Sequence, residues 1–187
     1  TGRNSDRLNE TLSNLSGEDH LAEVANLDTE EAIENLFKVL DAKVSSVDGI
    51  IHCAGIQKTL PLRSIKEADF DSIFGANVKS AQFIAKSFCK NNRFNKAGAS
   101  IVFMSSVAAN FGAPAISTYA SSKAALEGLS KSLAIELARK NVRVNCIAPG
   151  VVQTQMADKL SSVLTGAQYD HILSMHPLGI GSVEDVA

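Results

Sequence analysis

Apolar and polar residues along the chain alternate with two different periods. Four short, mainly apolar runs predict β-strands, at 21–27, 47–53, 99–104 and 142–147. Segments with apolar residues at helical spacing predict helices, at 28–40, 67–91 and 117–140, with two weaker ones near 154–165 and 167–175. Asp28, with Glu31 three residues later, has the pattern of a capping box at the start of the first helix. Between Gly75 and Asn77 we expect the second helix to break or kink.

Strands and helices that alternate along a chain favour an α/β fold with a doubly wound parallel sheet. The run at 99–104 is almost continuously apolar, which is typical of a strand buried on both faces. Leucines at 126, 129, 133 and 137 mark the core side of the longest helix. At 187 residues the chain has the length of one domain, so we predict a single domain over 1–187.

Composition mainly excludes functions. With 45% hydrophobic and 20% charged residues, the chain is typical of a globular protein. A net charge of −2 offers no basic surface for nucleic acid, and no apolar run is long enough to span a membrane. Cys53, Cys89 and Cys146 lack metal-binding or redox spacing, so we interpret them as reduced, buried thiols of a cytoplasmic protein. His171 and His176 are not spaced to bind zinc from one helix face, and we expect no metal.

Tyr119 and Lys123 are the residues that most directly indicate chemistry. Positions four apart on a helix share one face, so the ammonium group can lie beside the phenol. A cation about 4 Å away, at an effective dielectric constant near 20, favours the phenolate by roughly 4 kcal/mol as an upper bound. That energy corresponds to about three pKa units, which would make the tyrosine an acid or base near neutral pH. The pair alone is weak support, because amphipathic helices carry it by chance.

Three neighbouring features strengthen this interpretation. Ser106 lies thirteen residues before Tyr119 at the end of a predicted strand, Asn77 lies in the interrupted helix, and Pro149-Gly150 follows the last strand. With Lys123 they resemble the short-chain dehydrogenase/reductase family, which combines an Asn-Ser-Tyr-Lys tetrad with a late Pro-Gly turn. The resemblance runs along the whole chain with few gaps, and it is nearest to 3-oxoacyl-acyl-carrier-protein reductases.

The resemblance implies a role for each member of the tetrad. Ser106 would hydrogen-bond the substrate carbonyl oxygen and polarise it, whereas Ser105 would be structural. Tyr119 would donate a proton to the developing alkoxide. Lys123 would lower the pKa of the tyrosine and hydrogen-bond the nicotinamide ribose, and Asn77 would hold a water molecule of the proton relay behind it.

The resemblance to this family also implies contacts with a dinucleotide cofactor. Ala54 and Gly55 match the end of the Asn-Asn-Ala-Gly motif of the family, where small residues let the backbone approach the ribose. His52 and Cys53 depart from the two asparagines of that motif. His52 could be a catalytic base, but a structural histidine is the better interpretation. Asn26 and Leu27 resemble the adenine-contacting Asp-Val pair, and Asn26 keeps an acceptor there.

Two other segments indicate where the nicotinamide would bind and which cofactor the protein would prefer. The motif that would hold the nicotinamide carboxamide comprises Pro149, Gly150, Val152 and Thr154. Arg3 lies where the second strand of the family ends, and an arginine there accommodates the 2′-phosphate of NADP. We therefore expect NADP(H), with NAD(H) the less favoured cofactor.

Neither end of the chain matches a complete Rossmann sheet. No Gly-x-x-x-Gly-x-Gly motif for the pyrophosphate occurs. The residues at 182–187 resemble the start of the last large helix, with no strand after it. We therefore expect a Rossmann-like sheet that lacks the first β-α-β unit and the last strand, within one incomplete domain.

Two functions remain open. The first is an NADP(H)-dependent oxidoreductase that interconverts a ketone and a secondary alcohol, with a 3-oxoacyl thioester as a possible substrate. The second is a catalytically idle scaffold or oligomer partner with the same fold. For both, the resemblance implies a homodimer or homotetramer formed through the helices at 67–91 and 117–140. For the enzyme we expect an apolar lid over Tyr119, made of Met156, Leu160, Leu164, Ile172 and Met175.

Overall fold

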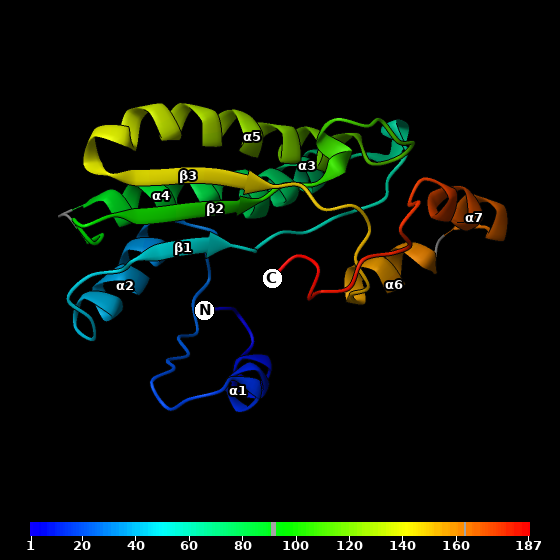
Figure 1. Ribbon diagram of the computed structural model, residues 1–187. Coiled ribbons are helices and arrows are strands. Elements are labelled where there is room, and N and C mark those ends of the chain that lie inside the picture. Colours follow the sequence, from blue (N-terminus) through cyan, green and yellow to red (C-terminus); the bar gives the residue numbers. More distant parts are fainter. Residues whose placement is uncertain (91–92, 163) are drawn as a thin grey trace.

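Three parallel strands form the centre of the protein (Figure 1). The computed structural model describes residues 1–90, 93–162 and 164–187. The strands, β1 (Gly49–His52), β2 (Ala99–Met104) and β3 (Val142–Ile147), lie in the order β1-β2-β3. Residues His52, Phe103 and Cys146 are level with one another across the sheet. This confirms the predicted Rossmann-like α/β class, and the bounds of β2 and β3 agree with the prediction.

Helices precede, connect and follow the strands. They are α1 (Ser5–Asn14), α2 (Glu30–Asp41), α3 (Glu67–Phe74), α4 (Ser80–Cys89), α5 (Ser117–Leu137), α6 (Gln155–Ser161) and α7 (Gly166–Ser174). Short 3₁₀-helices cover Leu62–Ser64, Val107–Ala109 and Ala138–Lys140. The expected break between α3 and α4 is a π-helical turn over Gly75–Lys79. None of the helices in the described residues is long and apolar enough to cross a membrane.

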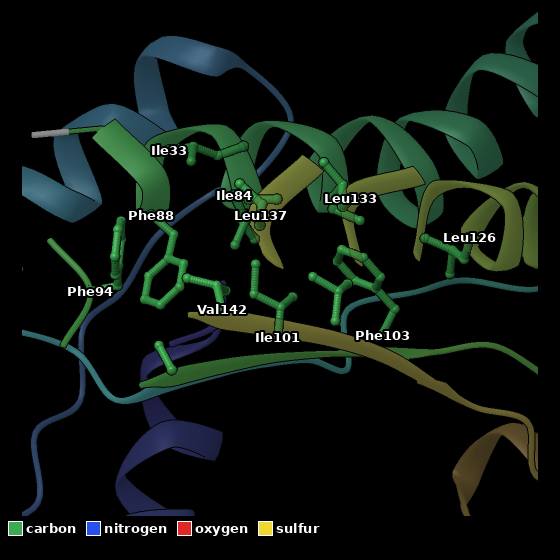
Figure 2. Packing of buried hydrophobic residues seen from close by; sticks show 14 of the residues in the cluster. Ile33, Ile84, Phe88, Phe94, Ile101, Phe103, Leu126, Leu133, Leu137 and Val142 are labelled. Atoms are coloured by element: carbon green, nitrogen blue, oxygen red, sulfur yellow. The ribbon is translucent and has the colours of Figure 1, made fainter. Parts of the chain in front are cut away.

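The hydrophobic core lies on one face of the sheet, under α2, α4 and α5 (Figure 2). Ile101 and Phe103 of β2 are fully buried there, against Phe88 of α4 and Leu126 of α5. Side chains alternate between the faces of a strand, and the other face is less covered than we expected for β2. Val102 on that face is only half-buried, and Ile51 of β1 is 70% exposed.

Several local predictions are wrong. The run at 21–27 is no strand, because only Val24 forms a bridge, with Gly2. The first predicted helix begins at Glu30, since the hydroxyl of Thr29, rather than Asp28, accepts the N–H of Ala32 at 3.1 Å. By contrast, the start of a helix expected at 182–187 agrees with the structure, because Ser182 and Asp185 cap each other's N–H groups and Ala187 N–H donates to the carbonyl of Val183 at 3.2 Å.

The cysteines also differ from the prediction. All three thiols are free, but Cys53 is exposed, and Cys89 and Cys146 are half-buried. Cys53 comes directly after His52, the last residue of β1. Successive side chains of a strand point to opposite faces, so the Cys53 side chain points away from the buried face that holds His52.

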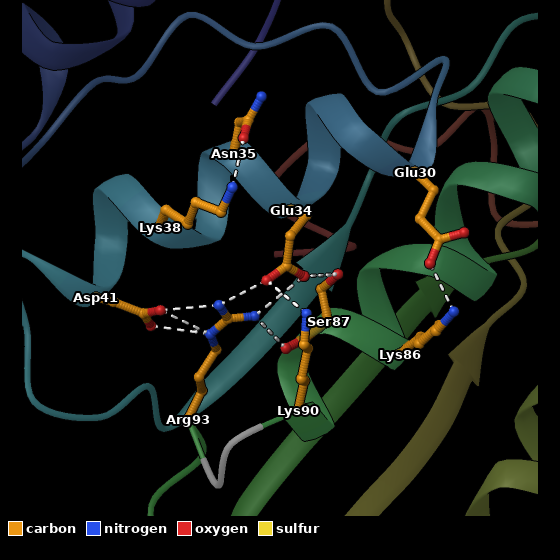
Figure 3. Close-up of polar contacts among 9 residues, drawn as sticks. All are labelled: Glu30, Glu34, Asn35, Lys38, Asp41, Lys86, Ser87, Lys90 and Arg93. Atoms are coloured by element: carbon orange, nitrogen blue, oxygen red, sulfur yellow. Dashed lines mark hydrogen bonds and ion pairs between the residues drawn. The ribbon is translucent and has the colours of Figure 1, made fainter.

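An ion-pair cluster joins α2 to the chain that follows α4 (Figure 3). The side chain of Arg93 is only 6% exposed, and its Nη2 atom lies 3.0 Å from Glu34 Oε1 and 2.8 Å from Asp41 Oδ2. Arg93 Nη1 donates to the carbonyl of Ser87 at 2.8 Å. These contacts hold the pKa of Glu34 at about 2, because its hydrogen bond with Arg93 stabilises the carboxylate. The cluster therefore fixes α2 against α4 at the edge of the core.

Candidate active site

The predicted site residues lie at the carboxyl ends of the strands. Gly55 follows β1, Ser106 follows β2, and Pro149 follows β3. Backbone hydrogen bonds continue past the sheet and hold the ends of β2 and β3 together. Ser105 N–H donates to the carbonyl of Ile147 at 2.7 Å, and Val107 N–H donates to the carbonyl of Pro149 at 3.0 Å. Ligands of open α/β sheets bind at this edge.

Helix α5 brings Tyr119 and Lys123 to the same edge. Both side chains are buried, with 9% and 5% of their surfaces exposed. Lys123 Nζ lies 5.6 Å from the centre of the Tyr119 ring and donates to the carbonyl of Met104, the last residue of β2, at 2.7 Å. The two side chains thus share one face of the helix, as their spacing predicts.

Ser106 completes the arrangement at the end of β2. Its hydroxyl is hydrogen-bonded to Tyr119 and lowers the pKa of the phenol. The same oxygen accepts the N–H of Ala108 at 3.2 Å and so caps the 3₁₀-helix Val107–Ala109. Ser105 points elsewhere, because its hydroxyl donates to the carbonyl of Lys123 at 3.0 Å. The structural role expected for Ser105 therefore agrees with its contacts.

The pKa of Tyr119 differs from the prediction. It is raised, because burial disfavours the phenolate more than the hydrogen bond from Ser106 favours it. Burial also lowers the pKa of Lys123, to about 8. The predicted lowering by Lys123 is absent here because the ammonium group faces the ring and binds Met104 rather than the phenolic oxygen. At neutral pH the phenol therefore keeps its proton.

Asn77 lies in the π-helical turn and is fully buried. Its Oδ1 atom accepts the N–H of Ile56 at 2.8 Å, and its Nδ2 atom donates to the carbonyl of Ile56 at 3.1 Å. The side chain thereby fixes the loop that carries Gly55. Turns of π-helix are common at functional sites.

The backbone at Gly55 packs closely against Asn77 and Lys123. A Cβ atom there would lie 3.3 Å from Asn77 Oδ1 and 3.4 Å from Lys123 Nζ, closer than most packed side chains come. The absence of a side chain at Gly55 therefore lets the polar atoms of Asn77 and Lys123 come close to the backbone. Donors and acceptors around exposed backbone suit the ribose hydroxyls of a nicotinamide dinucleotide, so these residues fit the expected cofactor.

The turn after β3 is held by the chain that follows α7. Val152 forms a parallel bridge with Gly181, and His176 Nε2 accepts the N–H of Val151 at 2.9 Å. A Cβ atom at Gly150 would lie 2.8 Å from that nitrogen, so a larger residue there would displace the imidazole of His176. Thr154 accepts the N–H of Ala157 at 3.4 Å in the first turn of α6.

The adenine-side residues lie apart from the tetrad, with no contact to it among the described residues. Arg3 is exposed next to the bridge between Gly2 and Val24. The side chain of Asn26 donates to Asp28 at 2.8 Å, whereas Leu27 packs against the core. Ala54 is half-buried beside Gly55.

His52 is a buried core residue. Its Nε2 atom lies 2.8 Å from the hydroxyl of Ser80, and that hydroxyl donates to Ala76 in the π-helical turn at 2.6 Å. Burial lowers the pKa of His52 to about 4, so the ring is neutral at pH 7 and poorly suited to act as a base. These contacts agree with the structural interpretation.

Sequence reasoning missed two polar side chains. Ser122 contacts Asn77 from α5, and His176 holds the turn after β3. Serine next to a lysine and an isolated histidine carry no signal of such contacts. In the described residues, no group of three or more His, Cys, Asp or Glu side chains could hold a metal ion.

Comparison with known proteins decides the family. A family model described as enoyl-(acyl carrier protein) reductase matches residues 2–187. A 3-oxoacyl-[acyl-carrier-protein] reductase FabG from Rickettsia typhi is 35% identical over the whole chain and 74% of its own length. The chain belongs to the short-chain dehydrogenase/reductase family.

Relatives from distant organisms agree with this assignment. The reductase FabG of Thermotoga maritima is 33% identical over 88% of this chain and 65% of its own length. Carbonyl reductase family member 4 of Danio rerio is 31% identical over 85% of this chain and 66% of its own length. As a short-chain dehydrogenase/reductase, the protein is an NAD(P)-dependent oxidoreductase. The comparisons give no support to a catalytically idle member.

Proposed function

We propose that the protein reduces a ketone to a secondary alcohol with NADPH, and that a 3-oxoacyl thioester is its substrate. The names of the relatives support this class, since several are 3-oxoacyl-[acyl-carrier-protein] reductases and one is a carbonyl reductase. The observation that carries the proposal is that Ser106, Tyr119 and Lys123 meet at the ends of the strands, with Ser106 near enough to lower the pKa of the phenol and Lys123 beside its ring.

The dinucleotide would lie along this edge of the sheet. Lys123, Tyr119 and the backbone at Gly55 would hold the nicotinamide ribose, and the turn from Pro149 to Val152 would hold the carboxamide. Ala54 and Thr154 would border the same groove. Asn26 and Leu27 would contact the adenine. The bound nicotinamide supplies the hydride that reduces the carbonyl carbon.

The side chains provide the proton. Because burial raises its pKa, Tyr119 stays protonated at neutral pH and can give its proton to the carbonyl oxygen as negative charge grows there. The hydroxyl of Ser106 donates a hydrogen bond to the same oxygen. Lys123 and Asn77 would lie on the path by which the proton of Tyr119 is replaced.

Replacing the phenolic hydroxyl tests this function. In the full-length protein, Tyr119→Phe should lower kcat for a short 3-oxoacyl thioester by about 10²-fold or more, because the proton donor is lost. The Kd for NADPH, measured by cofactor fluorescence, should change little. Tyr169→Phe, on α7, is the matched control and should retain activity. Near-normal turnover of Tyr119→Phe would mean that another group delivers the proton.

The cofactor preference depends on Arg3. Its exposed guanidinium group can bind a 2′-phosphate with two hydrogen bonds, and Gly2 offers no carboxylate for a 2′-hydroxyl. We therefore expect a higher kcat/KM with NADPH than with NADH. Arg3→Ala should remove most of that preference, mainly by raising the KM for NADPH. If NADH is the better cofactor of the unaltered protein, the argument from Arg3 is wrong.

Helices α6 and α7 lie beyond the carboxyl ends of the strands, where the acyl chain would lie (Figure 1). Met156 and Met175 are exposed, and Leu164 and Ile172 are half-buried. The fifth expected lid residue, Leu160, has a side chain outside the described residues. If this apolar surface covers the substrate, Met175→Asp should raise KM more for a long acyl thioester than for a small ketone.

We also propose a homodimer or homotetramer. Apolar side chains on α3 and α5 support it: Phe70 is 45% exposed and stacks on Phe74 at 4.4 Å, and Ile135 is 81% exposed. Light scattering should give a mass of two or four chains, and Phe70→Lys or Ile135→Lys should shift it toward one.

A further inference from the structure

Ser122 links the side chain of Asn77 to the helix of the catalytic tyrosine. Its hydroxyl is fully buried, accepts a hydrogen bond from Asn77 Nδ2 at 2.8 Å and donates to the carbonyl of Tyr119 at 2.7 Å. Asn77 and Ser122 are 45 residues apart in the sequence, and this contact joins the π-helical turn to α5.

The two hydrogen bonds of Ser122 fix the direction of the asparagine amide. A hydroxyl has one proton, and here the carbonyl of Tyr119 receives it, so the Ser122 oxygen can only accept from Asn77. Both Nδ2 protons are then used, one by Ser122 and one by Ile56. A flipped amide would place Oδ1 against the Ser122 oxygen and Nδ2 against the N–H of Ile56, which are both repulsive pairs.

This orientation determines which atom faces the lysine. Oδ1 accepts only the N–H of Ile56 among its contacts in the structure, so it can accept one more hydrogen bond. It lies close to the backbone of Gly55, as Lys123 Nζ also does. We propose that Ser122 is a positioning residue of the reaction, which keeps the acceptor oxygen of Asn77, rather than its amide nitrogen, turned toward Lys123.

The inference rests on the proposed function and has its own test. Ser122→Ala leaves one buried N–H of Asn77 without a partner and weakens the hold on the amide, which then depends on Ile56 alone. Ser121→Ala is the matched control, because the exposed Ser121 hydroxyl donates to the carbonyl of Thr118 at 3.0 Å in the same way but has no contact with Asn77. Ser122→Thr retains a hydroxyl at the position and serves as the rescue variant.

The expected result is a loss of kcat without a loss of cofactor binding. Ser122→Ala should lower kcat by about tenfold or more, since an unsatisfied buried donor is costly, while the Kd for NADPH stays within about twofold. Ser121→Ala should keep the activity of the unaltered protein, and Ser122→Thr should recover most of it. In an Asn77→Ala background, Ser122→Ala should have little further effect, because interacting residues are not additive.

Three results would overturn the inference. One is equal kcat values for Ser122→Ala and Ser121→Ala. Another is full additivity with Asn77→Ala. The third is an equal loss of kcat in a Ser122→Thr variant that melts normally, because the retained hydroxyl would then have no effect. If the unaltered protein reduces no carbonyl substrate, the proposed function itself fails, and that result is distinct from the other three.

Discussion

The ammonium group of Lys123 lies 5.6 Å from the centre of the Tyr119 ring and donates its hydrogen bond to the carbonyl of Met104. The lysine therefore stands beside the phenol without contacting its oxygen in the described contacts. Burial destabilises the charged form of Lys123, and this lowers its pKa to about 8. The site holds a poorly solvated cation next to the residue that we propose as proton donor.

This effect of burial predicts that Lys123→Met stabilises the protein and inactivates it. The pKa of Lys123 falls from 10.5 in the unfolded chain to about 8 in the fold, so between these values the unfolded chain binds more protons. The free energy of unfolding should therefore rise with pH from 8 to 10.5 in the unaltered protein, and less in the variant. At pH 7 the variant should be more stable by about 1 to 3 kcal/mol.

Urea unfolding at several pH values measures this difference. Lys131→Met, at an exposed position on the same helix, is the control and should leave the pH dependence unchanged. Parallel curves for the unaltered protein and Lys123→Met above pH 8 would contradict the prediction.

Adding one methyl group at Gly55 should impair catalysis. The new Cβ atom would lie 3.3 Å from Asn77 Oδ1 and 3.4 Å from Lys123 Nζ, so one of them must move. We expect Gly55→Ala to lower kcat/KM by about tenfold, since small displacements in an active site are costly. Gly128→Ala, within α5 and with no atom near the new methyl group, should retain activity and stabilise the helix by up to about 1 kcal/mol.

Neutral His52 should make the protein sensitive to acid. Its pKa is about 4 in the fold and 6.5 in the unfolded chain, so between these values the unfolded chain binds more protons. Stability should therefore fall as pH drops from 6.5 to 4, by at most about 3 kcal/mol from this residue. His52→Gln, which can still donate to Ser80, should show a smaller fall in thermal melts. His20→Gln, at an exposed position, should melt like the unaltered protein throughout this range.

The ion-pair cluster at Arg93 should matter for stability and not for chemistry. Arg93→Met leaves the carboxylates of Glu34 and Asp41 without their buried partner and should cost about 3 kcal/mol. Lys86→Met removes a pair with Glu30 in which both side chains are half exposed, and should cost less than about 1 kcal/mol. Urea unfolding measures both. Activity per folded molecule should stay the same, and a selective loss of kcat in Arg93→Met would contradict this assignment.

Strong periodic patterns in the sequence predicted the central elements. The apolar runs of β2 and β3 gave the correct bounds, and the leucines of α5 gave its start, because each burial pattern repeats over a whole element. Helix α5 ends at Leu137, and the predicted stretch to 140 is a 3₁₀-helix. The run at 21–27 failed because its alternation is interrupted by polar residues such as Glu23 and Asn26, and only one bridge forms.

Part of the candidate active site could likewise be predicted from the sequence, and part could not. The spacing of Tyr119 and Lys123 determines that they share a helix face, so their proximity could be predicted. The sign of the pKa shift of Tyr119 could not, because it depends on how much of the phenol the folded chain removes from water. Contacts of Ser122 and His176 join residues 45 and 25 positions apart, and no local pattern encodes such pairs.

The π-helical turn at Gly75–Lys79 makes the number of residues in this stretch as important as their identity. A π-helical turn holds one residue more than an α-helical turn, so deleting one of them would let the stretch close into regular α-helix and would remove the turn that presents Asn77. Ile84 and Phe88 could then stay on the core, but Asn77 would lose its contact with the N–H of Ile56. Natural variants of this protein should therefore carry substitutions between residues 67 and 89 far more often than insertions or deletions.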